Sequence, residues 1–236
     1  GGVSEAQLTN INVYFLIDAT NSMAVKDCDG DKMRRYEKMS SDIKEIAKQF
    51  PGAQYSIIAQ DISTYIALPL STSVDTLYSY ANAVIPKSEY YSSGSSISAL
   101  FDLAAENIST YSKGHPDRIN VLFLMGDGEE TRDPNNLVSA KSLQKYIAAG
   151  GVLGYGTKDG GQIPAVSYGS NYTNDADYFD ESRPVTDENY RKHISRLDET
   201  TLNNYAKALG VSYYNRASGE IDKTFGDEVM QNAKSE

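Results

Sequence analysis

The sequence has few of the residues on which several kinds of site depend. Its 236 residues include one cysteine, two histidines and no tryptophan. The single thiol, Cys28, cannot form an internal disulfide. The cysteine content therefore does not indicate whether the protein works in an oxidising or a reducing compartment. His115 and His193 are expected at the surface rather than as bases of a serine hydrolase triad. Neither a Gly-x-Ser-x-Gly elbow nor a Walker A or Gly-x-Gly-x-x-Gly pattern occurs.

Long apolar runs and an excess of positive charge are also missing. The longest apolar run is Val121–Met125, far short of the roughly 20 residues that span a bilayer. No signal peptide is recognisable, and we expect residues 1–9 to be an N-terminal tail or a cloning remnant. With 22 basic and 32 acidic residues the net charge is −10. This excludes nucleic acid as a partner and direct binding of this segment to an anionic membrane.

What the sequence does contain is an alternation of short apolar runs and helical patterns. Apart from Asn12 and Asn120, residues 12–17 and 119–125 are apolar, which is typical of strands buried on both faces. Further strands are expected at 54–59, 62–68, 152–155 and 211–214, and helices at 33–50, 74–84, 96–111, 137–149, 200–209 and 219–234. This alternation predicts an α/β fold, with a Rossmann-like, doubly wound and mainly parallel central sheet flanked by helices.

One stretch does not fit a compact α/β pattern. Residues 157–196 are polar and too long for an ordinary connection between two elements. We therefore expect a single domain over residues 10–234, with an inserted hairpin or lid around 157–196.

Candidate ligands follow the two strongly buried strands. Asp18, Thr20 and Ser22 come at the end of the first strand, Ser95 precedes a helix, and Asp127 follows the second buried strand. Ligands of an open α/β sheet bind at the carboxyl ends of its strands. Carboxylates and hydroxyls without imidazole or thiolate are a hard-oxygen set, which suits Mg²⁺ or Mn²⁺ rather than zinc or copper.

These residues resemble the motifs of a known family. Asp18-x-Thr20-x-Ser22-Met23 is similar to the Asp-x-Ser-x-Ser metal-ion-dependent adhesion site (MIDAS) of von Willebrand factor type A domains. Residues 94–97 and 124–128 resemble the second and third loops of that site, in the same order. Residues 154–164 and 195–198 resemble the later part of bacterial, membrane-anchored members of the BatA type.

The resemblance implies a metal site and a binding function without catalysis. Thr20, Ser22 and Ser95 would contact the ion directly, and Asp18 and Asp127 would act directly or through water. The ion would be Mg²⁺, with Mn²⁺ or Ca²⁺ as alternatives. An open coordination position would accept an acidic side chain of a protein partner, for adhesion or complex assembly. The resemblance also implies an extracytoplasmic or cell-surface domain of a membrane-anchored bacterial protein, although other family members are cytoplasmic partners of an ATPase.

Some neighbouring residues carry separate expectations. Gly126 stands where the family commonly has Thr or Ser, which we expect to loosen the loop that holds Asp127. Residues 27–31, Asp-Cys-Asp-Gly-Asp, do not fit an EF-hand, because their glycine is at the wrong position of the loop and the final Glu is missing. We expect them to form a solvated acidic loop. Glu129 and Glu130 are expected to face solvent.

Two other functions stay open at this stage. Asp18 could serve as the nucleophile of a Mg²⁺-dependent phosphohydrolase or phosphotransferase, although Thr20 stands where a haloacid dehalogenase would have an Asp. Alternatively the chain is a metal-free interaction scaffold whose 157–196 insertion makes the contacts.

Overall fold

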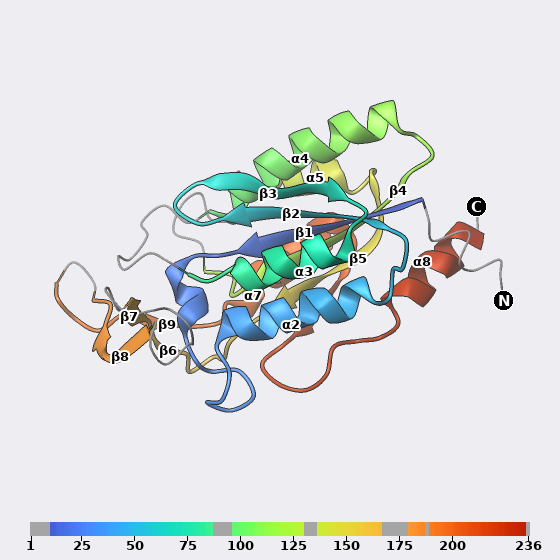
Figure 1. The fold of residues 1–236 in the computed structure, drawn as a ribbon. Helices are drawn as coiled ribbons and strands as arrows, with labels where there is room; N and C mark the ends of the chain where they lie inside the picture. The colour runs from blue at the N-terminus through green and yellow to red at the C-terminus, as the bar shows by residue number, and fades with distance from the viewer. Residues whose placement is uncertain (1–9, 87–95, 130–135, 167–178, 187–188, 235–236) are drawn as a thin grey trace.

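A six-stranded sheet forms the centre of the molecule. The computed structural model describes residues 10–86, 96–129, 136–166, 179–186 and 189–234. The strand order is β10-β5-β4-β1-β2-β3 (Figure 1). The strands are β1 (Ile11–Asp18), β2 (Gln54–Gln60), β3 (Thr64–Ser71), β4 (Ile119–Gly126), β5 (Ile147–Gly154) and β10 (Ser212–Asn215). Only the β2–β3 pair is antiparallel in this sheet, so the mainly parallel α/β prediction is confirmed.

Helices cover both faces of the sheet. They are η1 (Asn21–Ala24), α2 (Arg35–Ala47), α3 (Val74–Ala83), α4 (Ile97–Gly114), α5 (Val138–Leu143), α7 (Glu199–Leu209) and α8 (Phe225–Lys234). Side chains of α2, α3 and α8 share one buried apolar cluster with the sheet, and those of α4, α5 and α7 share the other. No helix in the described part of the chain is both long and apolar enough to cross a bilayer.

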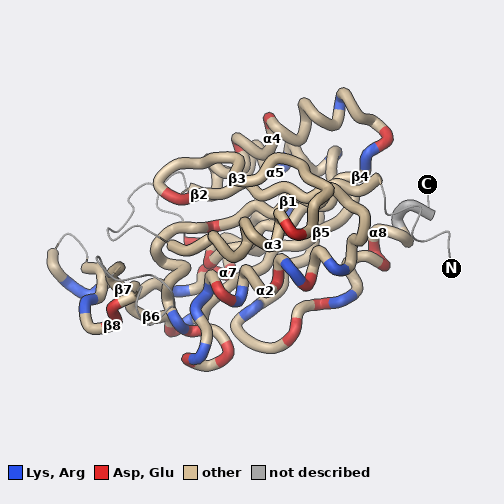
Figure 2. Tube along the Cα trace, viewed as in Figure 1, with Lys and Arg blue, Asp and Glu red and all other residues tan. Residues whose placement is uncertain are grey.

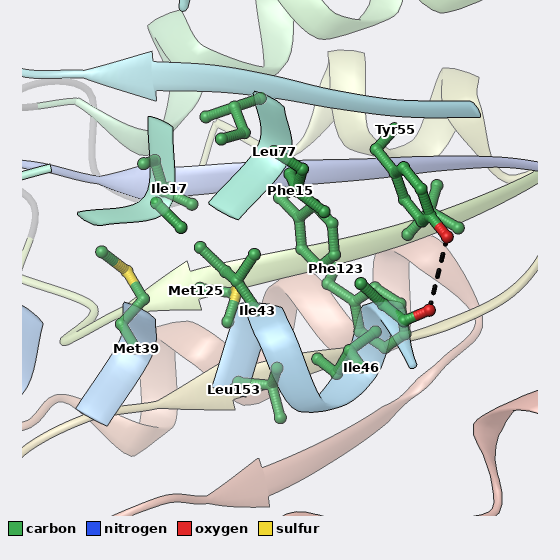
Figure 3. Close-up of a cluster of buried hydrophobic side chains, with 14 of the residues drawn as sticks. Phe15, Ile17, Met39, Ile43, Ile46, Tyr55, Leu77, Phe123, Met125 and Leu153 are labelled. Atoms are coloured by element: carbon green, nitrogen blue, oxygen red, sulfur yellow. Dashed lines mark hydrogen bonds between the residues drawn. The ribbon is translucent and has the colours of Figure 1, made fainter. Parts of the chain in front are cut away.

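The middle strands are buried because apolar side chains leave them on both faces. On β1, Phe15 and Ile17 point into the α2 layer while Leu16 points into the α4 layer. Figure 3 shows the first of these layers, where Phe15 lies against Phe123 of β4 with ring centroids 5.9 Å apart. Uninterrupted apolar runs are what a two-sided sheet requires, and this is why the sequence reveals β1 and β4 so clearly.

The expected helix over 137–149 is largely wrong. Only Val138–Leu143 is helical, and β5 begins at Ile147 and contains Gly150 and Gly151, which follow the expected helix in the sequence. A side chain on Gly150 would lie 1.8 Å from the carbonyl oxygen of Leu122 on β4. The glycine therefore serves close approach of two strands rather than helix termination.

Two other boundaries also differ from the prediction. The last helix begins at Phe225 instead of residue 219. Pro69, which directly follows the strand expected at 62–68, lies inside β3. It is tolerated there because β3 is an edge strand, and the backbone N–H groups on its outer side have no partner strand.

The segment between β5 and α7 forms two small antiparallel pairs. β6 (Gly161–Gln162) pairs with β9 (Ile194–Ser195), and β7 (Pro164–Val166) pairs with β8 (Phe179–Pro184). They lie at the end of the sheet toward which β1 points, next to η1 (Figure 1). Basic and acidic residues lie side by side there and along the start of α2, whereas the central strands carry few charges (Figure 2).

Candidate metal centre

The candidate site lies where the strand order reverses. β1 pairs with β2 on one side and with β4 on the other, so the carboxyl ends of β1 and β4 form the switch point of the sheet. Asp18 is the last residue of β1, and Asp127 directly follows β4. A Cβ on Gly126 would lie 2.8 Å from the Cβ of Asp18. Gly126 thus allows the two strand ends to approach, which differs from the expected loosening of the Asp127 loop.

Two hydroxyl–carboxylate pairs bring the predicted residues together. Thr20 Oγ1 donates to Asp18 Oδ1 at 2.6 Å, and the backbone N of Thr20 donates to the same oxygen at 2.9 Å. Ser22 Oγ donates to Asp127 Oδ2 at 2.6 Å. Four of the five predicted metal residues therefore form two hydrogen-bonded pairs, whose hydroxyl groups lie next to each other. The fifth, Ser95, lies outside the described residues.

The orientation of these hydroxyls fits a cation. The oxygens of Thr20 and Ser22 lie 3.2 Å apart, and each hydroxyl has a carboxylate acceptor for its proton. With both protons so placed, the two oxygens face each other with lone pairs only. A small cation bound to both would remove that repulsion, and octahedral Mg²⁺ places neighbouring ligands about 2.9 Å apart.

The local charge also fits a cation. Burial, followed by the negative charges of Asp127 and Glu129, raises the pKa of Asp18 to about 8 even though hydrogen bonds from Thr20 lower it. Such a shift means that negative charge at this position is poorly compensated by the protein itself. A bound divalent ion would supply that compensation.

The space beside Asp18 is small. A hollow of about 20 Å³ is lined by Asp18, Gln60, Ser96 and Glu129 together with apolar side chains of β4, α4 and α7, whereas Thr20, Ser22 and Asp127 do not line it. This is enough for one water or one ion. Among the described residues, no three His, Cys, Asp or Glu side chains are grouped as a metal site. Any site here therefore depends on hydroxyl oxygens as well as carboxylates.

Arg35 is the main feature of this region that the sequence did not indicate. Its side chain is fully buried, and Nη1 donates to Asp127 Oδ2 at 3.0 Å. The same guanidinium binds both carboxylate oxygens of Asp27, at 2.9 and 2.8 Å. The expected solvated acidic loop at 27–31 is thus wrong for Asp27, which is buried because Arg35 neutralises it.

Glu129 also differs from its expected solvent-facing position. Its Oε1 accepts from Ser195 Oγ at 2.6 Å and from the backbone N of Arg196. Ser195 and Thr157, which contact this network, fall within the two later segments that carry the family resemblance. That resemblance is the one sequence signal that could have drawn attention to them. Glu130 lies outside the described residues.

Comparisons with known proteins give structural relatives only. No protein-family model and no curated protein matches this chain. The conserved hypothetical protein BatB from Bacteroides thetaiotaomicron superposes with a TM-score of 0.74 and 20% identity, over 95% of this chain and 99% of BatB. An aerotolerance-related membrane protein from Bacteroides fragilis gives a TM-score of 0.70 and 20% identity, over 96% and 100% of the two chains.

A third structure is named for the fold itself. A von Willebrand factor type A protein from Catenulispora acidiphila has a TM-score of 0.52 and 16% identity, over 96% of this chain and 42% of that one. At these identities the likeness concerns the fold alone. The chain therefore has the fold of von Willebrand factor type A domains, and the similarity to BatB extends over almost the whole length of both chains.

Proposed function

We propose that this chain is a non-catalytic domain that binds a protein partner through a divalent metal ion. Thr20, Ser22 and Ser95 would hold the ion directly, and Asp18 and Asp127 directly or through water. The observation that carries the proposal is the pair of hydroxyl oxygens 3.2 Å apart, each hydrogen-bonded to its own carboxylate. Asp127 Oδ2 already accepts from both Ser22 and Arg35, which supports a role for Asp127 in orienting Ser22.

The chemistry supplied by the ion would be electrophilic binding of a carboxylate. Mg²⁺ takes six oxygen ligands and keeps several waters, and neutral hydroxyl ligands leave most of its charge uncompensated. An Asp or Glu side chain of the partner could then replace a water. Mg²⁺ is the ion we propose, with Mn²⁺ and Ca²⁺ as alternatives.

We further propose that the domain belongs to a membrane-anchored bacterial protein and works outside the cytoplasm. The support is the name of the Bacteroides fragilis relative, which is a membrane protein, and its match over the whole length of that structure. Detection of the full-length protein in membrane fractions, combined with protease accessibility in spheroplasts, tests this assignment. Protection from protease in spheroplasts but not after lysis would overturn it.

A thermal melt in EDTA and in Mg²⁺ or Mn²⁺ tests the metal site. An ion at about 100-fold excess over its Kd adds roughly 2.7 kcal/mol to the native state, which raises the Tm by roughly 5–10 °C for a domain of this size. Ser22→Ala should abolish this rise. Ser56→Ala is the matched control, because Ser56 is also buried and donates one hydrogen bond, to Leu68 O at 2.7 Å, on the β2–β3 pair.

A peptide pair tests the carboxylate partner. A short peptide with one Asp should displace water from bound Mn²⁺ and lower the water-proton relaxation enhancement, and its Asn counterpart should not. Equal binding of the Asp peptide in EDTA would favour the metal-free scaffold. Turnover of p-nitrophenyl phosphate that is lost in Asp18→Asn would instead favour the phosphohydrolase.

A further inference from the structure

We propose that Arg35 couples ion binding at Asp127 to docking of the segment that follows β5. This docked segment comprises residues 157–166 and 193–198. The inference rests on the proposed function, because it requires an ion at the Asp18–Asp127 site. In this proposal Arg35 is a positioning residue, and the docked segment between β5 and α7 helps to hold Asp127 in place.

A single planar group joins the metal edge to the docked segment. Arg35 Nη1 donates to Asp127 Oδ2 at 3.0 Å and to Ser195 Oγ at 2.8 Å. Arg35 Nη2 donates to the backbone oxygen of Ser195 at 3.0 Å and to Asp27 Oδ2 at 2.8 Å. The side chains of Arg35 and Asp127 are both fully buried, so water does not compete for these donors. A movement of Asp127 would therefore be felt at Ser195, and the reverse.

Further hydrogen bonds connect the docked segment to the same region without involving the guanidinium. Asp27 Oδ2 accepts from both the backbone N and the hydroxyl of Thr157 at 3.0 Å. Ser195 Oγ donates to Oε1 of Glu129 at 2.6 Å, and Glu129 lies two residues after Asp127 in the sequence. The backbone N of Asp198 donates to the carbonyl oxygen of Asp127 at 2.8 Å. The end at Ser195 and Asp198 is thus tied to the loop that carries Asp127, and the end at Thr157 is tied to Asp27, which Arg35 also binds.

Two glycines let the segment lie directly against the network. Gly156 has φ +115°, and a Cβ there would lie 2.5 Å from Arg35 Nε. Gly160 has φ +69°, and a Cβ there would lie 2.0 Å from the carbonyl oxygen of Ser195. Neither position has room for a side chain: Gly156 lets the backbone lie against the guanidinium of Arg35, and Gly160 lets the two parts of the docked segment approach each other.

Ion binding and docking of the segment must affect each other equally, so the size of the effect can be tested. If docking of the segment favours the ion by some factor, the ion favours docking by the same factor. Outer-shell partners of metal ligands typically change metal affinity 10–100-fold when they are removed. Ser195→Ala removes a contact of both Arg35 and Glu129 without altering any proposed ligand, so we expect it to weaken Mn²⁺ binding about 10-fold.

The experiment combines Mn²⁺ binding, followed by electron paramagnetic resonance, with hydrogen exchange read by mass spectrometry. In wild type, saturating Mg²⁺ should slow amide exchange in 157–166 and 193–198, and Ser195→Ala should lose most of that slowing. Arg35→Lys should act in the same direction. Arg216→Lys is the matched control, because Arg216 is a buried arginine paired with Asp42 and should leave Mn²⁺ affinity within about twofold.

The outcomes separate this inference from the function on which it rests. If wild type binds Mn²⁺ but folded Ser195→Ala binds it equally well, the coupling is overturned and the proposed metal site stands. The same holds if Mg²⁺ leaves exchange of the docked segment unchanged. If wild type binds no Mn²⁺, both proposals are overturned. Should Arg35→Lys fail to fold, Thr157→Val replaces it, because it removes one hydroxyl contact to Asp27 and nothing from Asp127.

Discussion

At the scale of the residue, the buried ion pairs are the positions most sensitive to substitution. Arg35 pairs with Asp27 and Arg216 pairs with Asp42, and all four side chains are almost wholly buried. Removing one partner of such a pair leaves an uncompensated charge inside the protein, which typically costs about 3–5 kcal/mol. Stability and the geometry of the candidate site therefore depend on the same groups.

Asp27 should make part of this stability depend on pH. Burial raises the pKa of Asp27, but hydrogen bonds from Arg35 and its charge, with help from Thr157, outweigh burial and lower it. A carboxyl with a depressed folded pKa stabilises the fold fully above its unfolded pKa, about 3.9, and loses this contribution as the pH falls through the folded pKa.

We therefore expect Asp27→Asn to lower the free energy of unfolding by about 3–5 kcal/mol at neutral pH. The difference from wild type should shrink below about pH 4. Urea unfolding at neutral and acidic pH measures it. Asp31→Asn, an exposed position in the same loop, is the control and should change little. A difference independent of pH would contradict the ion-pair explanation.

Gly126 is the second sensitive residue. In Gly126→Ala the new Cβ would meet the Cβ of Asp18 at 2.8 Å, so the ends of β1 and β4 must separate. We expect a loss of about 1–3 kcal/mol in denaturant unfolding, together with loss of the metal-dependent rise in Tm. Gly114→Ala is the control, because a Cβ there has no atom within 4 Å. An unchanged metal response in Gly126→Ala would show that the site does not need this close approach.

At the scale of the element, α7 begins at the candidate site. Asp198 caps the helix by accepting from the backbone N of Thr201 at 3.0 Å and from its hydroxyl at 2.9 Å. Its own backbone N donates to Asp127 O. Gly128, with φ +79°, makes this approach feasible, since a Cβ there would lie 2.4 Å from Asp198 O. The start of the helix and the loop of the site are thus built together.

Loss of the cap should therefore be measurable in α7. We expect Asp198→Ala to lower the free energy of unfolding by about 1 kcal/mol, with faster amide exchange in the first turn of the helix. Asp198→Asn should retain most of the stability because Asn is an equally good N-cap residue. Equal losses in the two variants would argue that the charge of Asp198 matters more than its cap.

At the scale of the whole molecule, the sheet separates two apolar layers. Phe123 on β4 stacks on Phe15 and meets the edge of Phe225 from α8 at 5.0 Å between ring centroids. The ring thus links the sheet to the last helix. Because interiors are close-packed, removing it leaves a cavity that neighbouring elements cannot fill.

Phe123→Ala should thus destabilise the domain as a unit. We expect a loss of about 3–5 kcal/mol, whereas Tyr190→Ala, at a position 89% exposed, should stay within about 0.5 kcal/mol. Chemical denaturation followed by both fluorescence and circular dichroism measures the two variants. A loss below about 1 kcal/mol for Phe123→Ala would mean that the two layers do not depend on this ring.

Local patterns in the sequence were sufficient for several elements. The apolar runs of β1 and β4 predicted two-sided burial, and the helix expected at 74–84 is present as α3, capped by Ser73, which accepts from Thr76 N. The helix expected at 200–209 is present as α7, and Gly210 ends it in the left-handed conformation. The helix predicted over 137–149 failed because the need for Gly150 comes from the neighbouring strand β4 and not from its own segment.

By itself, the sequence determined the α/β class and the position of Asp18 and Asp127 at strand ends, because periodicity and burial are local properties of a chain. Only the tertiary structure decided what surrounds those carboxylates. Arg35 and Ser195 are 160 positions apart, and no local pattern relates them. They meet because β4, α2 and the segment after β5 converge at one edge of the sheet. A buried guanidinium takes its acceptors from whichever elements reach that edge.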